Sequence, residues 1–122
     1  GGGFGHFYAY APEKIEYAMN RYRNEANRLY GVVNKQLEKN EWIAGGEYSI
    51  ADMSIMPWLR FPERQGVNID DYPHLKKWRD RIAARPAVKK ALEVLAERRR
   101  PTLSFTKEQA EVLFGATQYA RR

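Results

Sequence analysis

At residues 48–59 the chain reads YSIADMSIMPWL, and this stretch predicts a capped helix around which the rest of the fold is organised. Ser49 and Asp52 stand three residues apart, just before a run of apolar side chains, which is the pattern of a capping box. In that pattern the serine hydroxyl accepts from a backbone N–H of the first turn, and the carboxylate accepts from the N–H of Ser49 at the positive end of the helix dipole. We therefore assign Ser49 and Asp52 a structural role as a cap.

The residues after the cap are apolar on nearly every side, and a helix of that kind is normally surrounded by other elements. Pro57 stands well inside this helix, where it has no N–H to donate and its ring crowds the carbonyl of Met53. The sequence therefore predicts a core helix that kinks or ends early at Pro57.

Upstream of the cap, apolar residues recur at steps of three and four and predict one long helix of about seven turns. Pro12 suits its first position, and Lys35 and Lys39 suit its negative end. The residues expected to face the core are Ile15, Ala18, Met19, Tyr22, Ala26, Leu29, Tyr30, Val33 and Leu37.

Downstream of the cap, prolines delimit two shorter helices, the first beginning at Pro73 and the second at Pro86. A last helix is expected to begin at Thr106, three residues before Gln109, and to stop at Gly115. The apolar positions of the first two are Leu75, Trp78 and Ile82, then Val88, Ala91, Leu92 and Leu95. Since no segment has the pattern of a strand, the sequence predicts an all-α chain of five or six helices.

Residues 1–10, GGGFGHFYAY, are rich in glycine and aromatic side chains and have the pattern of neither a strand nor a complete helix. We expect them to be the end of a truncated first helix, with Phe4, Phe7 and Tyr8 packed on the body of the domain. Because the chain opens on three glycines without a methionine, we also expect a longer polypeptide to precede it.

The composition excludes some kinds of chemistry. With no cysteine in 122 residues there is no disulfide, no thiolate metal site and no catalytic thiol. His6 and His74 stand far apart without a metal-ligand motif, and no serine has a visible base, so we expect neither a metal site nor a catalytic residue here. The absence of a signal peptide or an apolar spanning segment favours a cytoplasmic protein that does not enter a membrane.

Charge is unevenly distributed along the chain. Residues 1–75 carry 8 basic and 10 acidic side chains, whereas residues 76–122 carry 13 basic and 5 acidic ones. A basic half can bind an anionic partner, but a solvated basic face is the simpler explanation. Binding of nucleic acid through residues 76–100 is therefore only a weak alternative.

One flank of the long helix is polar, because Tyr17, Arg21, Asn24 and Arg28 fall together at helical spacing. Such a strip could bind an anion. The alternative is that Arg21 pairs with Glu25 one turn further on, as a surface ion pair worth at most about 1 kcal/mol. Spacing alone favours the ion pair.

Taken together, the long helix, the YSIADMSIMPW cap and the segment YPHLKKWRDRIAARPAV resemble the all-helical C-terminal domain of a cytosolic glutathione S-transferase. Residues 1–32 are most similar to the bacterial Nu-class branch, whose members act as glutathione-dependent disulfide-bond reductases. The resemblance covers about residues 1–100, which we expect to form this helical domain. Residues 101–122 are then a C-terminal tail with a short helix.

The resemblance implies a function that the spacing does not. It implies that Arg21 contacts glutathione, whose carboxylates suit a guanidinium fork, and that the wall of the second-substrate pocket contains Phe4, His6, Phe7, Tyr8 and Tyr17. It also implies a homodimer with an N-terminal thioredoxin-like domain, which binds most of the glutathione and is absent here, so this piece alone should be inactive. The second substrate is then expected to be a disulfide, a peroxide or an electrophile, and the sequence does not distinguish them. A non-enzymatic role, as a helical module for protein assembly, is the alternative.

Overall fold

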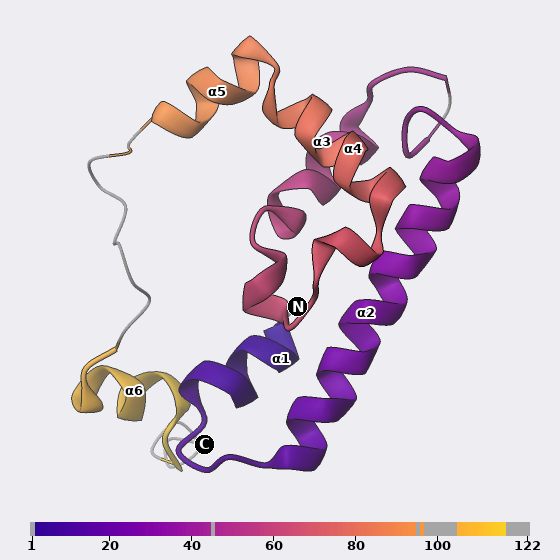
Figure 1. The fold of residues 1–122 in the computed structure, drawn as a ribbon. Coiled ribbons are helices and arrows are strands. Elements are labelled where there is room, and N and C mark those ends of the chain that lie inside the picture. The colour runs from indigo at the N-terminus through magenta and orange to yellow at the C-terminus, as the bar shows by residue number, and fades with distance from the viewer. Residues whose placement is uncertain (1, 45, 95, 97–104, 117–122) are drawn as a thin grey trace.

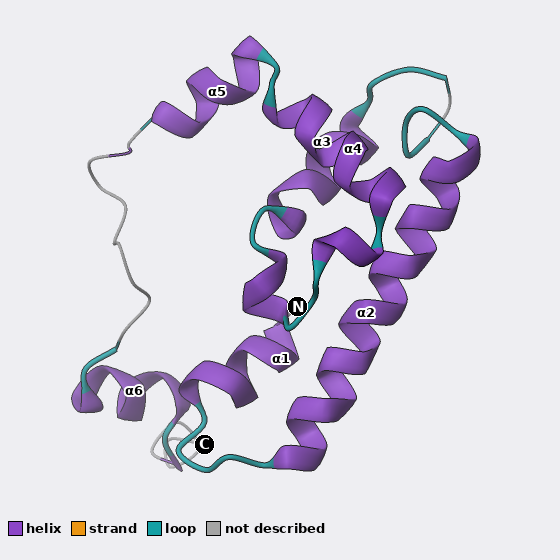
Figure 2. Cartoon of the chain, viewed as in Figure 1, coloured by secondary structure: helices purple, strands orange, loops and turns teal. Residues whose placement is uncertain are grey.

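The computed structural model describes residues 2–44, 46–94, 96 and 105–116, and every regular element in these ranges is a helix (Figures 1 and 2). The α-helices are α1 (Gly2–Gly5), α2 (Glu16–Lys39), α3 (Ile50–Ile55), α4 (Pro73–Ala83), α5 (Pro86–Glu93) and α6 (Lys107–Phe114). A π-helix, η1 (His6–Tyr10), continues α1, and the 3₁₀ turns are η2 (Met56–Leu59), η3 (Pro62–Gln65) and η4 (Ile69–Asp71). The predicted all-α class is confirmed.

Helix α2 is the longest element, and α1, η1 and α4 pack along it (Figure 1). The α1 and η1 segment lies beside its N-terminal half, and α4 packs against its C-terminal half. The core lies between α2, α4 and η2, where Leu75, Trp78 and Ile82 are almost completely buried. Tyr30 of α2 and Met56 of η2 pack against them. The apolar face predicted for α4 is therefore confirmed.

The predicted cap of α3 is confirmed, and so is the early end at Pro57. Both halves of the capping box are present: the Ser49 hydroxyl accepts from the N–H of Ala51 at 3.2 Å, and Asp52 accepts from the N–H of Ser49 at 3.0 Å. The α-helix ends at Ile55, and the chain continues as a 3₁₀ turn that contains Pro57.

The expectation that this helix is surrounded on all sides is wrong. Ile50 is 82% exposed and Trp58 is 70% exposed, and Met53 between them is also exposed. The reason is that α3 and η2 turn only one side, which carries Asp52 and Met56, toward the core. We call the exposed series Ile50, Met53, Trp58 and Phe61 the apolar ridge.

The start of α2 also differs from the prediction. The helix begins at Glu16 with Ile15 as its N-cap, and Pro12 lies outside it, because residues 11–15 are needed to reverse the chain between η1 and α2. The apolar stripe is only partly covered: Ile15, Tyr22 and Leu29 are exposed, whereas Ala26, Tyr30 and Leu37 are buried. Periodicity identified the apolar side of the helix correctly, but α1 and α4 each cover only part of its length.

The N-terminus of α4 is capped from another helix. Tyr72, its N-cap residue, makes no side-chain cap. Instead the side-chain oxygen of Asn34, on α2, accepts from the N–H groups of His74 and Leu75, both at 3.0 Å. This contact satisfies two of the free donors at the helix start and ties α4 to α2.

Helix α6 follows its predicted limits, but α5 ends at Glu93, earlier than predicted, because the backbone leaves the helical region at Val94. Helix α5 begins at Pro86, and α6 has the predicted capping box between Thr106 and Gln109 and ends before Gly115. Leu95, residues 97–104 and residues 117–122 lie outside the described residues.

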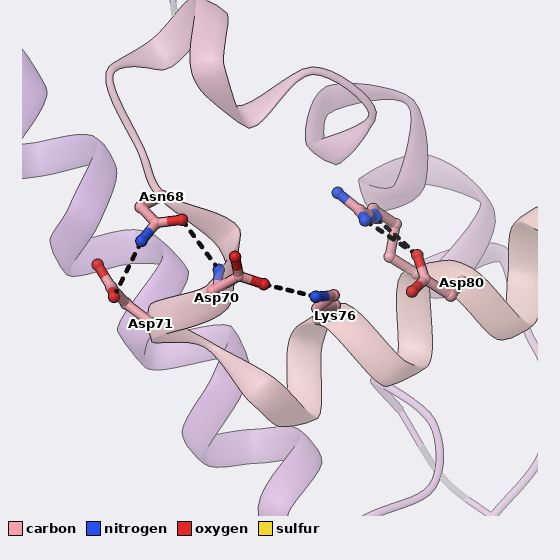
Figure 3. Close-up of polar contacts among 6 residues, drawn as sticks. Asn68, Asp70, Asp71, Lys76 and Asp80 are labelled. Carbon is pink, nitrogen blue, oxygen red and sulfur yellow. Dashed lines mark hydrogen bonds and ion pairs between the residues drawn. The ribbon is translucent and has the colours of Figure 1, made fainter.

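Acidic side chains neutralise several cations in the basic second half of the chain (Figure 3). Lys76 pairs with Asp70 at 2.5 Å, in a turn that Asn68 shapes by accepting from the N–H of Asp70 at 3.2 Å. Arg79 pairs with Asp80 at 2.9 Å. These contacts weaken the argument for a nucleic-acid surface, since paired cations attract phosphate less.

Candidate functional site

An aromatic cluster lies where α1 and η1 meet α2. Phe4 is buried and stacks on Tyr8 with ring centroids 5.1 Å apart, and Phe7 stacks on Tyr22 of α2 at 5.6 Å. Gly3 makes this close approach possible, because a Cβ there would lie only 2.5 Å from the Tyr22 ring. Packing thus requires a glycine at position 3, whereas a Cβ at Gly5 would meet nothing within 4 Å.

The backbone of η1 has an unusual hydrogen-bonding pattern that orients its side chains. The N–H of Ala11 donates to the carbonyl of His6, five residues earlier, at 2.8 Å. This wider turn is rare and occurs mostly as short insertions in helices, frequently at functional sites. It places the His6 ring edge-on to Phe7 at 5.2 Å. The segment expected to be an incomplete helix end is therefore helical throughout residues 2–10.

Helix α6 and the residue before its N-cap contribute two further rings that sequence reasoning missed. Phe114 stacks on Tyr10 at 5.5 Å and meets the edge of His6 at 5.1 Å. Phe105 lies 5.2 Å from Tyr10. The sequence pattern identified the helix and its cap, but it could not indicate where the helix docks.

Lys14 is a second feature that the sequence did not reveal. Its amine donates to the carbonyl of Tyr8 and lies 5.7 Å from the centroid of the Tyr8 ring. A cation within about 6 Å of a ring face interacts favourably with it. The candidate site therefore has a positive charge beside an exposed tyrosine.

Arg21 precedes Tyr22 on α2, and its side chain is 59% exposed. Its ion pair with Glu25 is loose, at 3.8 Å, which is too long for a hydrogen bond. Glu25 is instead held by Arg28, which donates two hydrogen bonds at 2.8 and 2.7 Å. The hydrogen bonding from Arg28 is the main reason that the pKa of Glu25 lies below its usual value. The sequence left two roles open for Arg21, an ion pair with Glu25 or anion binding. The ion pair is present but weak.

Four of the five residues expected in the pocket wall, Phe4, His6, Phe7 and Tyr8, come together in this cluster. Tyr17 does not join them: it is 79% exposed, and it is absent from the ring contacts within the described part of the chain.

Asp52, in contrast, lies away from this cluster and is completely buried. Its carboxylate accepts from the indole N–H of Trp78 at 2.8 Å and from the N–H of Ile43 at 3.1 Å, besides the bond within the cap. Burial alone would raise the pKa of Asp52, but these hydrogen bonds outweigh it and hold the pKa below its usual value. This environment keeps Asp52 ionised, which suits a structural role.

A separate cavity of about 440 Å³ lies between the C-terminal end of α2 and α4, where Leu37 and Trp78 form part of its lining. It contains none of the residues predicted for the site. Within the described ranges, no group of three or more His, Asp or Glu side chains could hold a metal ion. No described helix is long and apolar enough to span a bilayer.

The sequence and the fold were compared with those of known proteins. The family model for "Glutathione S-transferase, C-terminal domain" matches residues 5–86. The chain is 46% identical over 97 residues to the disulfide-bond oxidoreductase YghU of Escherichia coli K12, covering 74% of this chain and 34% of that protein.

Two solved structures have the same fold. The glutathione transferase YghU of Streptococcus pneumoniae, complexed with glutathione, is 42% identical with a TM-score of 0.69, over 77% of this chain and 39% of that one. Ure2p in complex with glutathione is 36% identical with a TM-score of 0.71, over 75% and 44%. The chain thus spans between about a third and a half of the length of these relatives.

Proposed function

The chain belongs to the glutathione S-transferase family as a C-terminal domain, and on this premise we propose that it supplies the second-substrate wall and a glutathione anchor for disulfide reduction or thiol transfer. The anchor is Arg21, and the wall is the aromatic cluster of α1 and η1. The relatives named disulfide-bond oxidoreductase and glutathione transferase support this choice of reaction.

The observation that carries the proposal is the state of the Arg21 guanidinium. Because Arg28 holds Glu25 with two short hydrogen bonds, the donors of Arg21 remain exposed to solvent. A guanidinium can donate two parallel hydrogen bonds to a carboxylate. Glutathione carries two carboxylates, and the exposed guanidinium of Arg21 suits one of them.

The reaction itself needs a thiolate that this chain does not contain, since it has no cysteine. The sulfur of glutathione, as thiolate, attacks one sulfur of the substrate disulfide and expels the other as a thiolate. A second glutathione thiolate then breaks the mixed disulfide, which yields oxidised glutathione and two substrate thiols once protons are taken up from water. The role of this domain is to bind and orient the two reactants.

We propose that activation of the glutathione thiol belongs to an N-terminal thioredoxin-like domain in a longer polypeptide, and that this polypeptide is a homodimer. Two observations support a further folded unit. The relatives are more than twice as long as the matched region, and the apolar ridge of α3 and η2 is exposed in this chain. Large exposed apolar patches mark surfaces that another unit covers.

The test is Arg21→Gln in the full-length polypeptide, assayed with glutathione and a small disulfide. Loss of a charge-assisted bidentate contact should raise KM for glutathione by about tenfold or more, with a smaller change in kcat. Lys35→Gln, another exposed cation on the same helix, is the matched control and should leave both constants unchanged. Unchanged KM and kcat/KM in Arg21→Gln would refute the anchor role.

A further inference from the structure

Helix α6 lies outside the region that the family model covers, since the match ends at residue 86. Nevertheless it contacts the candidate site directly. Phe114 touches both His6 and Tyr10, and Phe105 touches Tyr10 from the other end of the helix. The tail of this chain is therefore attached to the pocket wall by its two phenylalanines.

Two phenylalanines at the ends of α6 contact the same ring. The Thr106 hydroxyl accepts from the N–H of Gln109 at 3.2 Å, and the Gln109 side chain accepts from the N–H of Thr106 at 3.1 Å, which fixes the start of the helix just after Phe105. The Phe105 and Phe114 rings lie 5.9 Å apart, and both contact Tyr10.

The contacts continue inward from α6 as an unbroken series of rings. Phe114 meets His6 at 5.1 Å, His6 meets Phe7 at 5.2 Å, and Phe7 stacks on Tyr22 of α2 at 5.6 Å. His6 thus makes edge-type contacts with two rings, a favourable arrangement for aromatic pairs. Removing the Phe114 ring would take away one of these two contacts.

We propose that Phe114 is a positioning residue for the second-substrate site: by holding His6 and Tyr10 it sets the shape of the aromatic wall, so that selectivity for substrates with a large apolar group depends on α6. The inference rests on the proposed function. The inference adds that substrate selectivity depends on α6, a helix beyond the residues that the family model matches.

The contact is tested first in the chain itself by NMR of the imidazole protons. The chain has only two histidines, and His74 lies in the cavity between α2 and α4, so it serves as an internal reference. In Phe114→Leu the ring-current shifts of His6 should change while those of His74 stay constant. In Phe114→Tyr the shifts of His6 should remain close to wild type. Unchanged His6 shifts in Phe114→Leu would overturn the inference.

Selectivity is tested in the full-length polypeptide from the ratio of Kd for glutathione to Kd for S-hexylglutathione. Phe114→Leu should change this ratio by about threefold or more, as expected for the loss of aromatic contacts, and Phe114→Tyr should restore it. Lys107→Gln, at an exposed position in the first turn of α6, is the control and should leave the ratio unchanged.

The outcomes separate the two proposals. An unchanged ratio in Phe114→Leu with normal glutathione affinity would overturn the role of Phe114 alone. Failure of the wild-type polypeptide to bind glutathione would refute the proposed function, and the inference with it.

Discussion

Asp52 is the residue on which most of the buried polar structure depends. It closes the capping box of α3, and it also accepts from Trp78 of α4 and from the backbone at Ile43. One carboxylate therefore joins a helix start, a loop and a second helix. Because the group is completely buried, each of these donors would lose its partner without gaining water if the carboxylate were removed.

Ser49→Ala and Asp52→Ala should consequently differ in cost, although both residues belong to the same cap. Ser49→Ala should lower the free energy of unfolding by about 1 kcal/mol, the usual value for a lost N-cap. Asp52→Ala should cost about 3 kcal/mol or more, because buried donors are left unsatisfied.

Urea denaturation of the chain measures both values. Asp80→Ala, which removes an exposed partner of Arg79, is the control and should change stability by less than about 0.5 kcal/mol. Equal costs for Ser49→Ala and Asp52→Ala would show that the bonds to Trp78 and Ile43 contribute nothing.

At the scale of the element, the helices of this chain are positioned by side chains from other helices. Helix α4 begins at a proline, and its first N–H groups are satisfied by Asn34 of α2. Helix α3 is joined to α4 through Asp52 and Trp78. Such contacts fix how one helix lies on another, in addition to stabilising each helix end.

Asn34→Ala should lower the free energy of unfolding by about 1–2 kcal/mol, as for the loss of an N-cap residue. Asn34→Asp keeps a side-chain acceptor near the positive end of α4 and should retain most of the stability. Thermal or urea unfolding distinguishes the two variants. If Asn34→Ala were as stable as the wild-type chain, the cap seen between α2 and α4 would be energetically irrelevant.

At the scale of the whole molecule, the chain leaves several large apolar side chains exposed. The apolar ridge runs along α3 and η2, and Leu29 and Val32 of α2 are exposed as well. An apolar side chain exposed to water forgoes the favourable free energy that it would gain on burial. We therefore expect the ridge to be covered in the full-length polypeptide.

Ile50→Glu tests this expectation. In the chain alone, the substitution should change the free energy of unfolding by less than about 0.5 kcal/mol, because Ile50 is exposed and an acidic residue suits the first turn of a helix. In the full-length polypeptide it should destabilise by about 2 kcal/mol or more, because it would bury a charge and remove an apolar contact. A small effect in both would contradict a covered ridge.

The sequence alone determined the features that depend on neighbouring residues. The class, the cap at Ser49, the break at Pro57, the buried face of α4 and the limits of α6 follow from hydrogen bonds and spacing within a few residues. These are local rules, so they could be read without knowing how the helices pack. The family resemblance rests on the same local motifs and was also recognisable in advance.

Only the tertiary structure decided which side chains meet across the chain. Periodicity marked Leu29 and Tyr30 equally as apolar, but only Tyr30 is buried, because burial depends on where α1 and α4 lie along α2. Asn34 and His74, and Phe114 and His6, are far apart in sequence, and no local pattern encodes their contact. For the same reason the sequence could place Arg21 on a polar flank, while the competition between Arg21 and Arg28 for Glu25 became visible only in three dimensions.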